Sequence, residues 1–364
     1  MAGDKGGSGR RLGVYSAGPK VKNGPPFRVC SRPARGRSGR RGMSETGGAG
    51  GPTVLVTGAT GFVGRNVAGA LRGARFRVRA AVRRPGAEGF ADETVRISAI
   101  GSATDWNEAL AGVHAVVHAA GLAHRPARAR DADRELYAEV NVEGTRRLAE
   151  AAASRGIGTF VFLSSIAVNG AETDGIPFRE SDEPHPVTVY GQSKALAEDA
   201  VRRVAERSGM RALILRPPLI HGPAAPGNFA LLARAVGLRL PLPFGRVDNR
   251  RAYLGIDNLA GFIVDRLRGP EPAGTFILAD DEQCSTARLA SLIASALGRS
   301  PRLLPVPPRL LRGGLSVLRR KEMAGSILGS LEVDTARMRS TGWSPPCTLE
   351  EGIRRALRRS EGAE

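Results

Sequence analysis

The stretch Thr57-Gly58-Ala59-Thr60-Gly61-Phe62-Val63-Gly64 decides the fold of this chain. It follows a short apolar run at 53–56 and precedes a helical pattern that ends near Gly73, so the sequence predicts a strand, a glycine-rich turn and a helix in succession. Backbone N–H groups at the start of such a helix attract phosphate, and glycines let a pyrophosphate approach closely. The spacing is G-x-x-G-x-x-G instead of G-x-G-x-x-G, and a glycine-containing turn that binds nothing is the alternative interpretation.

Strand and helix patterns continue to alternate through the first half of the chain. This order predicts an α/β fold with a parallel, doubly wound sheet of the Rossmann type and right-handed crossovers. Ligands bind such sheets beyond the carboxyl ends of the strands, so the segments that follow the strands are expected to line one edge. The expected strands are 53–57, 75–82, 115–120, 159–163 and 211–215, and the expected helices include 139–154 and 190–207.

Prolines punctuate the chain from residue 217 onward, which indicates long loops and a smaller mixed lobe. We therefore expect a NAD(P)-binding Rossmann domain at 51–216 and a C-terminal substrate-binding lobe at 217–364, with a segment at about 253–280 returning to the Rossmann domain. Residues 301–320 combine leucine, proline and arginine. They predict either a basic amphipathic surface helix or, as the plainer interpretation, a partly buried helix with a solvated arginine face.

The net charge of +19 is unevenly distributed along the chain. Residues 1–42 hold 11 of the 54 basic side chains and only one acidic side chain, Asp4, so this segment alone carries +10. Its Gly/Arg-rich composition predicts a disordered leader over residues 1–50. Three interpretations stay open: an artefact of start assignment, since Met43 precedes the first strand, a solvated basic tail, or a transit peptide. The modest charge of the remaining chain argues against nucleic-acid binding.

Other bulk properties exclude further classes of protein. No run of 18 apolar residues occurs, so no membrane span is expected. The three cysteines are far apart without metal or redox spacing, which predicts free thiols in a reducing, cytoplasmic setting. No group of His, Asp and Glu has the spacing of metal ligands, so no metal is expected. Neither His118 nor His221 is expected to bind one, and a structural role is expected for His221.

Tyr190 and Lys194 stand four residues apart in a helical pattern, which places both side chains on one face. A free phenol has a pKa of about 10 and is a poor base at neutral pH, but a nearby ammonium group and a cationic nicotinamide both favour the phenolate. Ser165 ends a predicted strand upstream. These residues predict a site in which Ser165 holds a substrate oxygen, Tyr190 moves its proton, and a nicotinamide exchanges a hydride. An ordinary pair on a helix surface is the alternative, which the upstream glycine turn disfavours.

These motifs resemble the extended short-chain dehydrogenase/reductases of the NAD-dependent epimerase/dehydratase family, over about residues 52–357. The resemblance implies that Ser165, Tyr190 and Lys194 are catalytic, and that Ser165, Asn228 and Arg251 contact the substrate, the last two at its diphosphate. Relatives often dimerise through two helices of each subunit, and 190–207 would supply one here. Other similar segments are 118–120, 141–145, 160–165, 215–223, 251–260 and 342–345. The implied cofactor contacts are Gly58, Thr60, Gly61, Phe62, Val63, Gly64, Arg83, Ile100, Ala119, Ala120, Asn141, Lys194 and Pro217.

Within the family the chain is most similar to UDP-4-keto-6-deoxy-N-acetylhexosamine 4-reductases of the UDP-N-acetyl-quinovosamine type, and also to UDP-glucose 4-epimerase-like proteins. Asn169, which stands where many epimerases have tyrosine, and the segments 240–243 and 249–251 carry this likeness. The implied activity is an oxidoreductase acting at C4 of a UDP sugar. The likeness favours a reductase that uses external NADPH to reduce a 4-keto-6-deoxy-N-acetylhexosamine, and an epimerase with tightly bound NAD is the alternative. A dehydratase is disfavoured, because Ile166 and Ala167 replace the usual acidic pair. A non-catalytic NADP-sensing or nucleic-acid-binding protein on the same fold is the alternative of another class.

Three positions depart from the pattern of the family. Arg83 and Arg84 follow the second strand, where many relatives have an acid that binds the ribose 2′-hydroxyl, so NADP is favoured over NAD. Ala99, beside Ile100, replaces the usual adenine-binding Asp. Leu219 replaces an Asn that contacts the substrate in many epimerases, which puts that contact in doubt.

Overall fold

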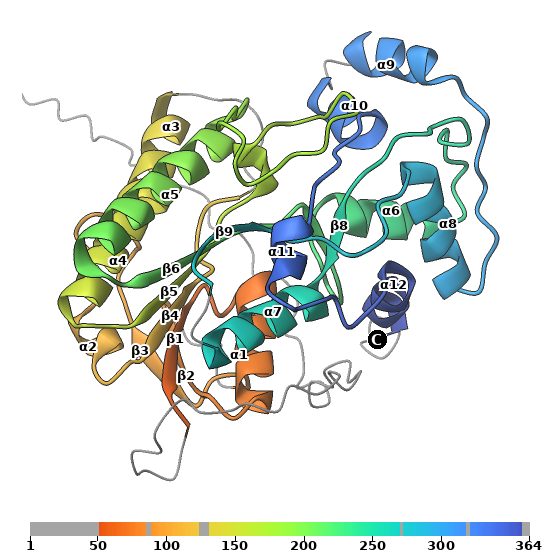
Figure 1. Ribbon diagram of the computed structural model, residues 1–364. Helices are drawn as coiled ribbons and strands as arrows, with labels where there is room; N and C mark the ends of the chain where they lie inside the picture. Colours follow the sequence, from red (N-terminus) through yellow and green to blue (C-terminus); the bar gives the residue numbers. More distant parts are fainter. Residues whose placement is uncertain (1–50, 85–88, 124–130, 270–271, 318–320, 359–364) are drawn as a thin grey trace, which may run out of the picture.

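The computed structural model describes residues 51–84, 89–123, 131–269, 272–317 and 321–358. The deciding stretch forms the predicted strand β1 (Thr53–Thr57), a turn, and helix α1 (Phe62–Gly73) (Figure 1). Gly58 has φ +68°, a left-handed conformation that favours glycine, and the backbone nitrogen of Gly61 donates to the Gly58 carbonyl at 2.9 Å. Within the described chain no side chain caps the start of α1, so its first N–H groups face the turn.

Seven parallel strands form one sheet in the order β3-β2-β1-β4-β5-β6-β9, which confirms the predicted Rossmann-type fold. The strand order reverses between β1 and β4, and such a switch point is where doubly wound sheets bind ligands. The prediction omitted β3 and β9, each only four residues long. β3 lacks an apolar run, whereas β9 opens the apolar run 276–279, a signal that the prediction overlooked. The other strands are β2 (Arg77–Val82), β3 (Glu93–Arg96), β4 (Ala115–His118), β5 (Thr159–Leu163), β6 (Arg211–Arg216) and β9 (Gly274–Ile277).

Helices cover both faces of the sheet (Figure 1). One face packs against α1 and α7 (Ile256–Arg268), and the other packs against α2 (Asn107–Leu110), α4 (Gly144–Ser154) and α5 (Val189–Ser208). Side chains alternate between the two core clusters, with Val54 and Val56 in the first and Leu55 in the second. This burial on both faces explains why the central strands read as continuous apolar runs.

The helix predicted at 139–154 consists of two elements. Residues Ala138–Glu143 form the π-helix η1, which follows α3 (Asp131–Tyr137), and only then does α4 begin. Thr145, Leu148, Ala149 and Ala152 form a buried stripe along α4, whereas Val142 in η1 is half-buried. A π-helical turn is wider than an α-helical one, so it moves Val142 off the stripe of a regular helix.

The chain after residue 217 forms a smaller lobe around a two-stranded parallel sheet of β7 (Leu219–His221) and β8 (Tyr253–Gly255). Helices α6 (Asn228–Gly237), α8 (Thr286–Ala296) and α12 (Leu349–Arg358) pack around its core. In contrast, α7 and β9 join the Rossmann core, so the chain crosses between the two parts more than once. The remaining elements are η2 (Ile166–Val168), α9 (Pro308–Val317), α10 (Lys321–Leu328) and α11 (Ala336–Ser340).

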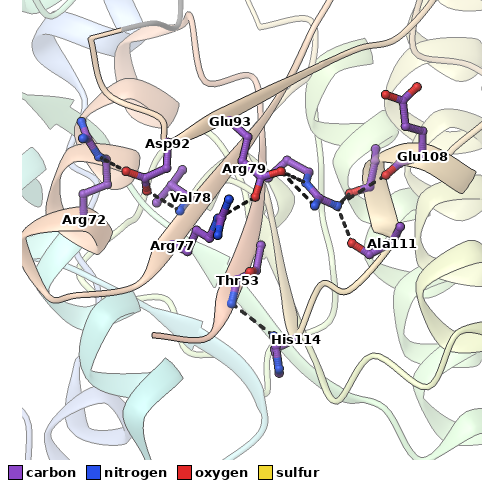
Figure 2. Close-up of polar contacts among 11 residues, drawn as sticks. Thr53, Arg72, Arg77, Val78, Arg79, Asp92, Glu93, Glu108, Ala111 and His114 are labelled. Atoms are coloured by element: carbon purple, nitrogen blue, oxygen red, sulfur yellow. Dashed lines mark hydrogen bonds and ion pairs between the residues drawn. The ribbon is translucent and has the colours of Figure 1, made fainter. Parts of the chain in front are cut away.

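Arg79 of β2 fastens the outer part of the sheet to α2 (Figure 2). Its Nε donates to a carboxylate oxygen of Glu93 on β3 at 3.0 Å. Its Nη1 donates to the carbonyl oxygens of Ala109 at 3.2 Å and Ala111 at 2.5 Å, where α2 ends. A cation at a helix C-terminus is favourable because the last carbonyl groups carry partial negative charge. Arg79 is therefore used inside the fold and adds little to the basic surface.

The expectations for the leader, for membrane spans, for metal ligands and for the cysteines are compared here with the described residues. Those made for residues 1–50 lie outside the described residues. Among the helices that the structure describes, none is long and apolar enough to cross a membrane. The described residues also contain no cluster of three or more His, Cys, Asp or Glu side chains arranged to hold a metal ion. Cys284 is a buried free thiol, but Cys347 is disulfide-bonded, so the expectation of free thiols is wrong at Cys347.

Candidate active site

The glycine turn packs tightly against the segment that follows β4. A Cβ at Gly58 would lie 2.8 Å from the backbone nitrogen of Ala120 and 2.9 Å from the carbonyl carbon of Ala119. A Cβ at Gly64 would lie 2.2 Å from the carbonyl oxygen of Gly58. Side chains at these positions would push the turn away from the sheet. The bare backbone and the uncapped start of α1 fit the pyrophosphate of a dinucleotide.

The other predicted turn residues occupy two different settings. Thr60 and Gly61 are exposed at the tip of the turn, whereas Val63 packs against the sheet-side core. Phe62 packs against both the Rossmann core and the core of the lobe. The glycine turn therefore lies where the two parts of the molecule meet.

His118 ends β4 and fixes the strands beneath the turn. One ring nitrogen, Nδ1, lies 2.7 Å from Oγ1 of Thr57, and the other, Nε2, lies 3.0 Å from Oγ1 of Thr145. Burial and, to a smaller extent, the nearby charge of Lys194 together lower the pKa of His118 to about 3. The imidazole is therefore neutral at physiological pH and holds neighbouring elements together.

Tyr190 and Lys194 project from the start of α5, which is held firmly in place. The hydroxyl of Thr188 caps the helix by accepting from the backbone nitrogen of Gly191 at 3.0 Å. A Cβ at Gly191 would lie 2.6 Å from the carbonyl oxygen of Ala167, so the helix start touches the segment after β5. This contact brings the predicted catalytic residues of α5 next to Ser165.

The phenol of Tyr190 is half-buried and faces two neighbours. Its ring meets Tyr137 edge-on, with the ring centroids 6.4 Å apart. Burial raises the pKa of Tyr190, whereas a side-chain hydrogen bond with Ser165 lowers it. That bond brings together the two hydroxyls that the sequence predicted to work on one substrate oxygen.

Lys194 is buried beside the carboxyl ends of β4 and β5. Its Nζ donates to the carbonyl oxygen of Leu163 at 2.7 Å and lies 4.7 Å from the centroid of the Phe162 ring. Burial lowers the pKa of Lys194 to about 8, while the charge of Glu198 opposes that shift. At neutral pH the group remains mostly an ammonium, which favours the phenolate form of a nearby tyrosine.

Ser164 and Ser165 both follow β5 but have separate tasks. The hydroxyl of Ser165 accepts from the backbone nitrogen of Ala167 at 3.2 Å, which caps η2, and it also reaches Tyr190. Ser164 is buried and donates to a carboxylate oxygen of Glu198 at 2.5 Å. Only Ser165 is therefore available to a substrate.

A buried ion pair behind α5 is the largest feature that sequence reasoning missed. Glu198, one turn beyond Lys194, is fully buried and accepts from Nε of Arg216 at 2.9 Å and from its Nη2 at 2.6 Å. Arg216 also donates to Oδ1 of Asn169 at 3.0 Å, and the amide of Asn169 donates to the carbonyl of Arg179 at 2.8 Å. The sequence did offer one signal for this pair: Glu198 stands four residues after Lys194 and therefore shares the helix face of Tyr190 and Lys194.

This cluster joins α5, the end of β6 and the loop after β5. Besides Arg216, the carboxylate has three neighbours: Ser164 and Arg202 donate hydrogen bonds to it, and Lys194 interacts with it through charge. The spacing between Ser165 and Lys194 therefore depends on an internal ion pair. Asn169, singled out for its place in the family pattern, belongs to this support and uses its polar atoms within the chain.

Asn141, a predicted cofactor contact, lies in the π-helical turn. Its Oδ1 accepts from the backbone nitrogen of Leu122 at 2.8 Å, and its Nδ2 donates to the Leu122 carbonyl at 3.1 Å and to Oγ of Ser193 at 2.9 Å. The amide thus clamps the loop after β4 to α5. A direct contact from Asn141 to a cofactor stays a prediction.

The other predicted cofactor residues follow the carboxyl ends of neighbouring strands. Arg83 is exposed after β2, and Ile100 is half-buried against the core on the α4 side. Ala119 and Ala120 follow β4 and flank Gly58, as described above. Pro217 is buried after β6, and its carbonyl accepts from the backbone nitrogen of Ile166 at 3.0 Å. All of them therefore lie along one edge of the sheet, as expected.

The two predicted substrate residues lie in the lobe. Asn228 is exposed at the first position of α6. Arg251 is half-buried, and its Nη1 donates to the carbonyl oxygens of Gly325 at 3.2 Å and Gly329 at 2.6 Å. Burial lowers the pKa of Arg251, and the nearby Tyr253 and Glu172 oppose this shift. Arg251 thus fastens the end of α10, and any contact to a diphosphate stays a prediction.

His221 has the structural role that was expected for it. Its Nε2 lies 2.9 Å from Oδ2 of Asp280, and both side chains are buried. The same carboxylate accepts from the backbone nitrogen of Gly255 and from Nδ2 of Asn258. This group of contacts joins β7 and β8 to the start of α7.

The parallel sheet, the glycine turn and the Tyr190–Lys194 pair define a Rossmann-type enzyme of the nicotinamide-dependent class. The chain belongs to the NAD dependent epimerase/dehydratase family, whose sequence model matches residues 54–275. It is 36% identical to a UDP-glucose 4-epimerase of Vibrio cholerae, over 83% of this chain and 93% of that protein. It is 28% identical to N-acetyl-alpha-D-glucosaminyl-diphospho-ditrans,octacis-undecaprenol 4-epimerase of Escherichia coli O157:H7, over 84% and 94% of the two chains.

A similar fold occurs in the crystal structure of the UDP-glucose 4-epimerase of Thermus thermophilus in complex with NAD. That structure superimposes with a TM-score of 0.68 at 24% identity, covering 86% of this chain and all of the other. It supports the architecture described above and adds no residue assignment.

Proposed function

We propose that this protein is a UDP-sugar 4-epimerase that oxidises and re-reduces C4 with Ser165, Tyr190 and Lys194. The observation that carries the proposal is the approach of the Tyr190 phenol to the Ser165 hydroxyl, with a buried ammonium one turn away, at the sheet edge that also bears the glycine turn. Two curated relatives named as 4-epimerases support the reaction type. One of them is named for a UDP sugar and the other for a lipid-linked sugar, and we propose the UDP form.

Each residue of the site has a defined task in this reaction. A bound nicotinamide supplies the acceptor and donor of the hydride. Ser165 orients the 4-hydroxyl of the sugar, and Tyr190 takes its proton during oxidation and returns it to the 4-keto oxygen during reduction. Lys194, held by the carbonyl of Leu163, keeps positive charge near the phenol and lowers the cost of the phenolate.

The second candidate is a reductase of UDP-4-keto-6-deoxy-N-acetylhexosamines. The likeness at Asn169 and at 249–251 supports it, and so does the exposed Arg83 after β2, which suits the 2′-phosphate of NADP. The same Ser165, Tyr190 and Lys194 set serves this reaction. The reductase and the epimerase differ in whether the reduced cofactor is consumed.

One experiment distinguishes the candidates. The purified protein is incubated with UDP-glucose or UDP-N-acetylglucosamine, and separately with UDP-4-keto-6-deoxy-N-acetylglucosamine and either NADPH or NADH. An epimerase brings a UDP sugar to equilibrium with its 4-epimer without net change in absorbance at about 340 nm. A reductase removes that absorbance stoichiometrically. If no UDP sugar changes under any condition, the substrate class is wrong, and a Tyr190→Phe preparation controls for contaminating enzymes.

For the reductase candidate we infer NADP as the preferred cofactor from Arg83, and the test compares two arginines. Arg83→Ala is expected to weaken NADPH binding about tenfold relative to NADH, because it removes the partner of the 2′-phosphate. Arg96→Ala, an exposed arginine on the neighbouring strand β3, serves as the control. Equal affinity for NADH and NADPH in the unaltered protein would contradict the preference.

We also propose a homodimer formed through α4 and α5. A surface hollow of about 330 Å³ lies between η1, α4 and α5, and Leu196 at its border is 56% exposed. Leu196→Glu is expected to convert dimers to monomers in light-scattering measurements. A monomeric unaltered protein at micromolar concentration would contradict this proposal.

A further inference from the structure

The outer edge of the lobe exposes leucines next to arginines. Leu238 and Leu310 are 61% and 67% exposed, and Leu240 and Leu304 are exposed as well. These residues come from two segments that pair with each other. The backbone nitrogen of Leu304 donates to the Leu242 carbonyl at 2.8 Å. We name the paired segments, 238–242 and 302–312, the leucine–arginine rim.

Helix α9 forms the projecting part of this rim. In Figure 1 it lies at the outer end of the lobe, next to α10 and far from the parallel sheet. Leu310 and Leu311 are adjacent on the helix, whereas Arg309 and Arg312 are three residues apart and share another face. Both arginines and Leu310 are exposed, which supports the surface-helix interpretation of this segment.

The rim is strongly positive. The sequence contains no Asp or Glu from 228 to 247 or from 283 to 321. The arginines of the rim are Arg239, Arg302, Arg309 and Arg312, all of them exposed. Arg312 approaches a carboxylate of Glu172 only at 3.9 Å, and both side chains are largely exposed, so its charge is weakly compensated.

We propose that the leucine–arginine rim docks the protein on an anionic lipid surface. A helix with exposed leucines and nearby arginines can place its apolar side at the boundary of headgroups and acyl chains while the guanidinium groups contact lipid phosphates. Nucleic acid offers the same phosphates but gives the four exposed leucines no apolar layer to enter. The convex shape of a projecting helix also suits a flat surface, and the rim needs no membrane-spanning segment to bind one.

The test measures binding of the full chain to vesicles of phosphatidylglycerol and of phosphatidylcholine by co-sedimentation. The unaltered protein is expected to bind phosphatidylglycerol vesicles and to bind phosphatidylcholine vesicles far less. Leu304→Ser combined with Leu310→Ser is expected to lower the partition coefficient at least tenfold. Arg309→Gln combined with Arg312→Gln is expected to lower it about tenfold, and 0.5 M salt should remove most of the remaining binding.

Two matched variants control for general changes of surface. Val187→Ser removes an apolar side chain that is 59% exposed in the loop before α5, and Arg75→Gln with Arg96→Gln removes two exposed arginines near the sheet. Neither is expected to change vesicle binding by more than about twofold. All variants keep residues 1–42, so the charge of that segment is common to every comparison. Thermal unfolding and turnover of each variant check that the fold is intact.

Three results would overturn the proposal. Equal vesicle binding by the leucine variant and the Val187→Ser control would show that the rim is not the contact. Self-association of the unaltered protein that the leucine variant abolishes, without an effect on lipid, would make a second copy the partner. Loss of binding to a mixed RNA pool in the arginine variant, with RNA and vesicle binding unaffected in the leucine variant, would make nucleic acid the partner.

Discussion

The junction of β5, β6 and α5 and the leucine–arginine rim use arginine in opposite ways. At the junction Arg216 is buried, and its guanidinium group is shared between Glu198 and Asn169. At the rim Arg302 and Arg309 are exposed. A buried arginine with a fixed carboxylate holds elements in place, whereas an exposed arginine beside leucines is available for a partner. The comparison indicates that the geometry of the site depends on internal pairs, and that the rim can change without affecting catalysis.

The largest effect on stability is expected when the buried carboxylate of Glu198 at the junction is removed. Glu198→Gln leaves the charge of Arg216 buried without its partner, so the free energy of unfolding is expected to fall by about 3 kcal/mol. Glu282→Gln, which breaks an exposed pair with Arg288, should change it by less than about 0.5 kcal/mol. Urea unfolding followed by circular dichroism measures both. Equal losses of unfolding free energy in the two variants would mean that the buried pair contributes no more to stability than the exposed pair.

The second prediction concerns the glycine turn after β1. Gly58 and Gly112 have nearly equal φ values, +68° and +67°, so alanine strains the backbone similarly at both, by about 1 kcal/mol. Only at Gly58 does the new Cβ meet backbone at 2.8 Å, since Gly112 has nothing within 4 Å among the described residues. Gly58→Ala is therefore expected to weaken NAD binding at least tenfold by calorimetry, and Gly112→Ala to leave it unchanged. Similar NAD affinity in both variants would remove the turn from the cofactor site.

The third prediction concerns the pH dependence of turnover, which reports how Glu198 affects the pKa of Lys194. Turnover is expected to decline as pH rises through about 8, because Lys194 then loses its ammonium charge. The charge of Glu198 raises the pKa of Lys194, so Glu198→Gln should move this decline to lower pH. The folded pKa lies below the ordinary value of 10.5, so the unfolded state binds more protons between about 8 and 10.5, and this group makes stability rise with pH there. A pH–rate profile that is flat to pH 9.5 would contradict the assignment of Lys194.

The smallest effect is expected at the rim. Arg309→Gln combined with Arg312→Gln should leave the free energy of unfolding within about 0.5 kcal/mol and turnover within about twofold, because exposed arginines contribute little to stability. Urea unfolding and the sugar assay with the vesicle-free protein measure this. A large loss of stability would show that Arg309 and Arg312, like Arg216, hold the fold together.

The parts of the fold that local sequence determines were predicted well. β1, its glycine turn and α1 follow from adjacent glycines and an apolar run, and β5 and α5 follow from equally local patterns. β3 was missed because four residues without an apolar run carry little signal. At β9 the apolar run 276–279 was a local signal that the prediction overlooked, and its pairing with β6 joins residues about 60 positions apart. The π-helical turn at η1 was missed because its period differs from that of the helix it extends.

The candidate site was predictable only in part. Tyr190 and Lys194 share a helical turn, so their spacing alone brings them together. The pair of Glu198 and Arg216 spans 18 residues and forms only when β6 lies beside α5. The diphosphate contact of Arg251 stays a prediction. Its hydrogen bonds to carbonyls of the α10 segment join residues 74 to 78 positions apart, which no local pattern encodes.

The most direct test of the central claim follows the hydrogen at C4 of the sugar. A UDP sugar carrying deuterium at C4 is incubated with the unaltered protein and with Tyr190→Phe, and both sugar epimers are examined by NMR and mass spectrometry. If Tyr190 moves the proton while hydride leaves and returns at C4, the 4-epimer forms with its deuterium retained, and the variant turns over at least a hundredfold more slowly. Replacement of the C4 deuterium by solvent hydrogen, or near-normal turnover by Tyr190→Phe, would contradict the account.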